Sequence, residues 1–171
     1  MQAERVLALW ALFEENDLEV CLDGGWAVDA ALGRQTRPHG DLDIALPASR
    51  VPTLRRLLSG LGFEEIPQPD SWEHNFVLRD RDGAQLDVHS YELNPDGSNR
   101  LGVAYVADHL SGEGRILGHP VRCVPPDWLV RSHAGYELDD DDWHDVRLLC
   151  ERFDIPVPDV FAPFLDRHSK G

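Results

Sequence analysis

Two acidic residues two positions apart, Asp41 and Asp43, are the residues of this 171-residue chain best suited to chemistry. They alternate with the apolar residues Leu42, Ile44 and Leu46, as in a strand with one buried face. Side chains two apart on a strand share a face, so the two carboxylates project together and repel each other. A hard cation such as Mg²⁺ would relieve the repulsion, because it prefers oxygen ligands and often takes only one or two carboxylates plus substrate phosphates. The alternative interpretation is a strand whose polar face meets solvent.

A third carboxylate lies on a later segment with the same alternation. The run 79–83 ends in Asp-Gly and predicts a hairpin turn, and the strand that returns from it covers 85–89. This strand presents Asp87 between apolar neighbours, with His89 on the same face. If the two acidic strands are neighbours, Asp87 supplies the carboxylate that the first pair lacks.

A glycine pair precedes the acidic strand. Gly24 and Gly25 stand between a predicted strand over 18–22 and a predicted helix over 26–32. Glycine lets the backbone approach an anion closely, and the unpaired N–H groups of a helix start face that anion. Arg37, which follows this helix, could contact a triphosphate. A tight turn and a surface arginine are the alternatives.

Charge and composition exclude several classes. The chain has 31 acidic and 16 basic residues and a net charge of −15, so it lacks the Lys and Arg excess that binds nucleic acid. An acidic surface favours a cationic or neutral small molecule, or serves solubility alone. The chain has no apolar run long enough for a membrane span, no signal-peptide pattern at its start and three scattered cysteines. We expect a cytoplasmic protein without a membrane partner, disulfide frame or zinc site.

The remaining pattern predicts an α/β (α+β) protein. We expect a core over residues 1–124 and a small C-terminal helical annex of the same unit over 125–171. Asp29 and Asp145 are expected to be structural carboxylates, at a turn or on the surface, and 94–114 is expected to form loops. Further helices are predicted over 4–15, from 47 to 61, over 127–133, from 139 to 153 and near 161–165. Further strands are predicted over 63–66 and 72–78, and a last hairpin over 116–124 around Gly118 and His119.

The order of these elements resembles the nucleotidyltransferase superfamily. Two segments, 22–29 with Asp-Gly-Gly-Trp and 37–44 with Asp-Leu-Asp, resemble the small antibiotic nucleotidyltransferases, namely the lincosamide and the 2''-aminoglycoside enzymes. Segments 86–89, 93–98 and 133–137 favour the lincosamide group. The resemblance is weakest between Val103 and Gly118. It also departs from the lincosamide pattern at His89-Ser90, where those enzymes tend to have His-Pro.

The resemblance implies a mixed β-sheet flanked by helices and a Mg²⁺-dependent transfer of AMP from ATP, or of another nucleotide from its triphosphate, to a hydroxyl of a small antibiotic. Two metal ions are expected. Asp87 would complete the second metal site or take the proton of the acceptor hydroxyl. For the 133–137 segment, a helix C-cap with a packed tyrosine is the alternative. The implied site residues are Asp41, Asp43 and Asp87 for metal and catalysis, Gly24, Gly25 and Arg37 for phosphates, and His89, His133, Tyr136 and Glu137 for the acceptor.

Three rival functions remain beside a lincosamide nucleotidyltransferase. An aminoglycoside nucleotidyltransferase suits the negative charge, because aminoglycosides are polycations. A non-catalytic module that binds nucleotide or a partner protein has the same fold, although three retained carboxylates speak against it. A nucleic-acid tailing enzyme would need a basic tract that the sequence lacks. The oligomeric state cannot be predicted.

Overall fold

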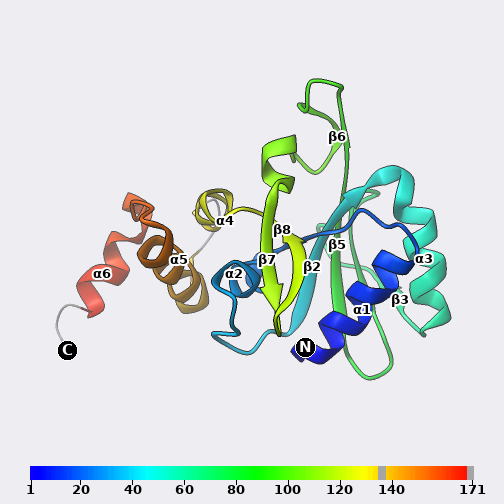
Figure 1. Cartoon of the computed structure of the whole chain (residues 1–171), viewed down its shortest axis with the longest axis horizontal. Helices are drawn as coiled ribbons and strands as arrows, with labels where there is room; N and C mark the ends of the chain where they lie inside the picture. The colour runs from blue at the N-terminus through cyan, green and yellow to red at the C-terminus, as the bar shows by residue number, and fades with distance from the viewer. Residues whose placement is uncertain (135–137, 169–171) are drawn as a thin grey trace.

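The computed structural model describes residues 1–134 and 138–168, with side chains through residue 165. Its centre is one mixed sheet, to which eight strands belong in this described part (Figure 1). The strand order is β3-β4-β5-β2-β1-β8-β7, and β6, which is not on that path, pairs antiparallel with the last residues of β5. The strands are β1 (Cys21–Asp23), β2 (Asp41–Pro47), β3 (Glu64–Ile66), β4 (Asn75–Arg79), β5 (Gln85–Leu93), β6 (Asn99–Gly102), β7 (Gly112–Ile116) and β8 (His119–Cys123).

The acidic strand β2 occupies the middle of the sheet. It pairs antiparallel with β1 and parallel with β5. The apolar residues Leu42, Ile44 and Leu46 alternate with the acids and are fully buried. Neighbouring β5 repeats this arrangement with Leu86 and Val88, which are buried to the same extent. The two apolar rows anchor both strands in the core and direct the intervening side chains to the opposite face.

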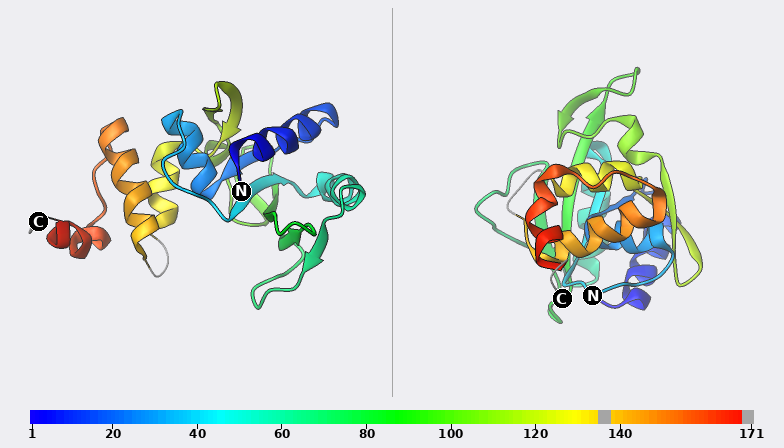
Figure 2. Two further views of the ribbon diagram at one scale, coloured as in Figure 1. Left: turned by 90° about the horizontal axis from the view of Figure 1, so that it is seen from below. Right: turned by 90° about the vertical axis from the view of Figure 1, so that its left-hand side faces the viewer.

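Helices pack against the sheet and continue beyond it. Helix α1 (Ala3–Glu15) buries Val6, Leu9, Trp10 and Phe13, which recur at helical spacing. In Figures 1 and 2 the C-terminal helices extend to one side, beyond α2. The other helices are α2 (Gly24–Leu32), α3 (Val51–Gly60), α4 (Pro126–His133), α5 (Asp140–Phe153) and α6 (Ala162–His168), with short 3-10 turns η1 (Ala48–Arg50), η2 (Ala107–Leu110) and η3 (Asp159–Phe161).

Local chemistry sets several of these boundaries. Helix α2 begins at Gly24, where Asp23 caps it by accepting a hydrogen bond from the Gly24 N–H at 2.8 Å. It ends at Gly33, whose φ of 72° suits a glycine cap. The acidic run before Trp143 starts α5 with a capping box, in which Asp139 and Asp142 each accept the other's backbone N–H at 2.9 Å. That run is therefore a helix start, as its sequence predicts.

The sequence-based fold class is confirmed, and two of its details are wrong. The strand expected over 18–22 lies later, at β1, so that Asp23 belongs to the sheet. The segment expected as loops over 94–114 contains β6, η2 and the start of β7. In the described residues, no helix combines the length and apolar character that a bilayer crossing requires. All three cysteines are buried free thiols.

Candidate active site

Three aspartates form a row across the middle of the sheet. Asp43 on β2 lies opposite Asp23 on β1 and opposite Asp87 on β5. Residues that pair across neighbouring strands project from the same face, so the three side chains share one surface. Asp41 joins them from two positions earlier on β2. The sheet thus brings together the three acids that the sequence singled out and adds Asp23, which sequence reasoning missed.

The diglycine is shaped to hold this row closely. Gly24 has a φ of 56°, and a Cβ built on it would lie 2.2 Å from the Oδ2 of Asp43. A Cβ on Gly25 would lie 2.5 Å from the Nδ1 of His39. Any side chain at either position would displace a side chain of the site. Both glycines are therefore required for close approach, and Gly24 also for its left-handed backbone.

The carboxylates destabilise one another. Burial, followed by the charges of Asp41, Asp23 and Asp87, raises the pKa of Asp43 well above its ordinary value. Within the described part of the chain, no hydrogen bond or ion pair joins Asp41 or Asp43 to a basic side chain. An acidic cluster in which burial and like charges act together is typical of a functional site.

Two neighbouring hollows open at this surface. The first, which we name the diglycine hollow, has a volume of about 300 Å³. It is lined by Asp23, Gly24, Gly25, Trp26, Arg37, His39, Asp41, Asp43, His89, Ser132, His133 and Asp142. The second, the Asp87 hollow, has a volume of about 410 Å³. It is lined by Gln68, Asp70, Ser71, Asn75, Val77, Arg79, Gln85, Asp87 and His89.

His89 is common to the two hollows, whereas Asp87 lines only the second. The acids of the row therefore line two hollows, which meet at His89. Burial is the main cause that raises the pKa of Asp87, which also accepts a hydrogen bond from the Nε2 of Gln85 at 2.9 Å. Gln85 in turn accepts from Arg79 at 2.5 Å. Arg79 therefore reaches Asp87 only through an amide.

The acids fit a divalent cation that brings part of its own ligand shell. In the part of the chain that the structure describes, no three His, Cys, Asp or Glu side chains are arranged to hold a metal ion alone. Mg²⁺ usually retains waters and phosphate oxygens and uses only one or two carboxylates. Asp41 and Asp43 both line the diglycine hollow, and neither pairs with a basic side chain among the described residues. They provide that number of ligands.

Arg37 lines the diglycine hollow but donates its hydrogen bonds elsewhere. Its guanidinium binds Asp145 through Nε at 3.0 Å and through a second nitrogen at 2.7 Å, and it reaches Asp141 at 3.3 Å. Asp145 is fully buried on α5. The remaining nitrogen also donates to the carbonyl oxygen of Pro38 at 3.4 Å, so the predicted phosphate contact would compete with these partners. The pair ties the segment before β2 to the C-terminal helices.

Asp29 and Asp145 are not surface carboxylates, contrary to the sequence-based expectation. Only 2% of Asp29 is exposed, and its Oδ2 lies 2.5 Å from the Nε2 of His39. Its Oδ1 accepts hydrogen bonds from the backbone and hydroxyl of Thr36 at 2.9 and 2.7 Å. His39 packs against Trp26 and against Gly25, so Asp29 supports the diglycine from behind. The polar residue types gave no indication of this burial.

The remaining predicted acceptor residues have different outcomes. His133 is buried at the end of α4; its Nδ1 lies 2.7 Å from the carbonyl oxygen of Leu129 and its Nε2 lies 3.9 Å from Asp145. It also lines the diglycine hollow. Tyr136 and Glu137 lie outside the described residues. Their predicted role in binding the acceptor stays a prediction.

Several known proteins are similar to this chain in sequence and in fold. A family model described as aminoglycoside-2''-adenylyltransferase matches residues 5–149. The chain belongs to this family. It is 31% identical over 144 residues to a lincosamide resistance protein of Staphylococcus haemolyticus, an alignment that covers 81% of this chain and 88% of that one.

Two solved structures extend the family likeness to three dimensions. A lincomycin-bound crystal structure of the lincosamide antibiotic adenylyltransferase LnuA is 26% identical, with a TM-score of 0.75 over 87% of this chain and 96% of that one. A crystal structure of ANT(2'')-Ia in complex with adenylyl-2''-tobramycin is 25% identical, with a TM-score of 0.77 over 98% of both chains. The chain is therefore an antibiotic nucleotidyltransferase by family, and the predicted fold and enzyme class are confirmed.

A substitution of Arg37 tests whether its ion pair with Asp145 joins the segment before β2 to helix α5. We expect Arg37→Gln to lower the free energy of unfolding by about 3 kcal/mol, because Asp145 would remain buried without its partner. The side chain of Arg37 is 20% exposed, so the expected loss of stability lies at the lower end of the range for broken buried ion pairs. Urea unfolding monitored by tryptophan fluorescence measures it.

Arg147→Gln is the matched control on α5. Arg147 pairs with Glu151 at 2.9 Å, but both side chains are exposed, so we expect a loss of about 0.5 kcal/mol or less. Equal stability of Arg37→Gln and the native protein, together with a loss of ATP binding, would contradict the structural role and favour a phosphate contact.

Proposed function

We propose that the protein transfers AMP from Mg²⁺-bound ATP to a hydroxyl group of a small antibiotic. The observation that carries this proposal is the packing of Asp43 against Gly24, between Asp23 and Asp87. Carboxylates that repel one another beside a close-approach glycine suit a ligand that brings a cation together with phosphates. The triphosphate of a nucleotide with its magnesium is such a ligand.

The transfer makes one bond and breaks one. The acceptor oxygen bonds to the α-phosphorus, the bond from that phosphorus to the bridging oxygen breaks, and pyrophosphate leaves with the bonding electrons. Magnesium, when bound, neutralises charge on the phosphate oxygens and helps the leaving group depart. Asp41 and Asp43 would hold up to two ions. The backbone at Gly24 and Gly25, together with Arg37, would orient the phosphates, since positioning and electrostatics supply most of the catalysis in such reactions.

A general base must accept the proton of the acceptor hydroxyl. We propose that Asp87 accepts it, because Asp87 lines the second hollow and not the one that Asp41 and Asp43 line. Burial raises the pKa of Asp87 above the ordinary carboxyl value, which makes it a better base near neutral pH. Its hydrogen bond from Gln85 holds the carboxylate in one orientation.

The acceptor class has two candidates, each with a specific observation. A lincosamide is favoured by the sequence segments around Asp87–His89 and His133, and by the relative from Staphylococcus haemolyticus. An aminoglycoside is favoured by the Asp87 hollow, whose lining is polar apart from Val77 and includes the carboxylates of Asp70 and Asp87. Such a lining attracts an acceptor with several ammonium groups, as does the net charge of −15.

A product assay decides between these classes. The purified protein is incubated with Mg²⁺ and ATP together with lincomycin, clindamycin, tobramycin or gentamicin. The molecular mass of each drug is then measured by mass spectrometry. We expect one class to gain the mass of an AMP group and the reaction to release pyrophosphate. The absence of an adduct on all four drugs would overturn the proposed function, whereas adducts on one class identify the acceptor.

Asp43→Asn separates the catalytic use of the carboxylate from its effect on stability. We expect transfer to fall by at least about 100-fold, since a charge that binds the metal is lost while the shape is retained. The raised pKa of Asp43 means that its ionisation opposes folding as the pH rises above the ordinary value of 3.8. The metal-free variant should therefore be more stable than the native protein at neutral pH, and the difference should vanish below about pH 4.

Chemical unfolding in the presence of a chelator, repeated across pH, measures this difference. Asp82→Asn is the control, because Asp82 is exposed in the turn between β4 and β5 and should change neither transfer nor stability. A metal-free Asp43→Asn protein that is less stable than native at neutral pH would show that the carboxylate row is not repulsive. Retained transfer would remove Asp43 from the metal site.

Asp87→Asn tests the proton acceptor. We expect the turnover number to fall about 100-fold or more, because the amide cannot take the proton. The KM for ATP should change less than about threefold, because ATP is bound in the other hollow. Steady-state kinetics with the identified antibiotic measure both quantities. A variant with normal turnover and a raised KM for ATP would place Asp87 on the nucleotide instead.

A further inference from the structure

A hydrogen-bonded chain leads from the diglycine to the wall between the two hollows. Asp23 accepts a hydrogen bond from the backbone N–H of Gly24 with one oxygen, and its other oxygen lies 2.5 Å from the hydroxyl of Tyr105. That hydroxyl lies 3.1 Å from the Nδ1 of His89. Asp23 and Tyr105 are not among the site residues expected from sequence.

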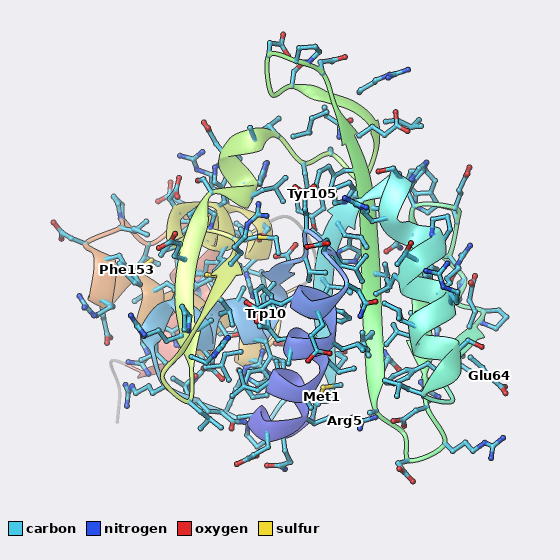
Figure 3. The ribbon with its side chains drawn as sticks, turned by 45° about the vertical axis from the view of Figure 1, so that its right-hand side comes forward. Met1, Arg5, Trp10, Glu64, Tyr105 and Phe153 are labelled. Carbon is cyan, nitrogen blue, oxygen red and sulfur yellow. The ribbon has the colours of Figure 1, made fainter. Side chains whose placement is uncertain are left out.

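Tyr105 is held firmly in place. Only 6% of it is exposed, and it lies near the end of the sheet from which the β6 hairpin projects (Figure 3). Tyr91 on β5 and His109 on η2 each meet its ring edge-on, with centroids 5.7 Å away. Its hydroxyl is consequently directed by packing, and its two polar contacts are consistent with a single rotamer.

The proton of each group in the chain can be assigned. Tyr105 donates its single hydroxyl proton to the Oδ2 of Asp23. Burial and the neighbouring Asp23 raise the pKa of Tyr105 well above its ordinary value, so the phenol keeps this proton. The phenol oxygen can then only accept, and His89 must be the donor through Nδ1–H. In a neutral imidazole the other nitrogen, Nε2, is left as an acceptor.

We propose that Tyr105 is a positioning residue, which fixes the tautomer of His89 so that Nε2 accepts a hydrogen bond from an O–H or N–H group of the acceptor. Among the described residues, no hydrogen bond to Nε2 of His89 occurs, and the side chain lines both hollows. The group bound would be a neighbour of the reacting hydroxyl, which gives its own proton to Asp87. The identity of the ligand rests on the proposed function, but the tautomer does not.

The tautomer is measured directly by the ¹⁵N chemical shifts of the imidazole nitrogens, at a pH well above the ordinary histidine pKa. The signal of His89 is assigned among the eight histidines by its loss in His89→Gln. We expect Nδ1–H in the native protein and a redistribution towards Nε2–H in Tyr105→Phe, which has no oxygen to accept from Nδ1. A native His89 that carries its proton on Nε2 overturns the proposal without any variant or substrate.

The kinetic arm tests the consequence for the acceptor. In Tyr105→Phe we expect the KM for the antibiotic to rise about three- to tenfold, as for the loss of one hydrogen bond, with the KM for ATP unchanged. Tyr91→Phe is the matched control: its ring packs against Tyr105, and its hydroxyl makes no hydrogen bond among the described residues. It should change neither the His89 shifts nor the KM.

The two arms fail in distinguishable ways. A shifted tautomer with an unchanged KM for the antibiotic would overturn the contact between Nε2 and the acceptor. An unshifted tautomer in Tyr105→Phe would overturn the positioning role, whatever the kinetics. Failure of the native protein to modify any antibiotic would reject the proposed function, while the chemical shifts would still decide the arrangement of Asp23, Tyr105 and His89.

Discussion

Mutual repulsion of half-buried carboxylates is the constraint on which the site depends. Asp41, Asp43 and Asp87, with Asp23 beside them, stand on adjacent strands in the middle of the sheet, where backbone pairing prevents them from moving apart. The apolar faces of β2 and β5 supply the stability that tolerates this repulsion, since Leu42, Ile44, Leu86 and Val88 are all fully buried. A bound cation would relieve this repulsion, and for that reason we propose a metal-bound nucleotide as the ligand.

The C-terminal helices are joined to this site by charge. Arg37 connects the segment before β2 to the buried Asp145 of α5, and Asp29 holds His39 against Gly25. Each contact uses a buried carboxylate that lies outside the row of Asp23, Asp43 and Asp87. Asp145 belongs to α5 and Asp29 to α2, so helices from two parts of the chain support residues that line the diglycine hollow.

The sequence predicted the parts that depend on local patterns. Strict alternation identified β2 and β5, helical spacing identified α1, α3 and α5, and a proline-led start identified α4. Asp23 was missed because alternation over 18–22 ended the first strand too early, and its place opposite Asp43 follows from an antiparallel pairing that no local signal encodes. Tyr105 stands in a segment without periodicity, 82 residues from Asp23, and Arg37 lies 108 residues from Asp145. Contacts of that range come from the tertiary fold alone.

The spacing of the acids is fixed by the sheet, whereas loop residues around the two hollows can vary. Asp43 and Asp87 are held one strand apart, a spacing of about 4.8 Å that backbone hydrogen bonding fixes. The reacting groups of two substrates can therefore be aligned by the sheet, whatever the acceptor is. Strands β4 and β5 supply most of the lining of the Asp87 hollow, but Asp70 and Ser71 come from the connection before β4. Tyr105 reaches His89 from the loop after β6. Loops tolerate substitution better than central strands. A family with both lincosamide and aminoglycoside enzymes would be the expected result if, as we propose, a rigid row of acids performs the chemistry and the residues from these connections help to select the acceptor.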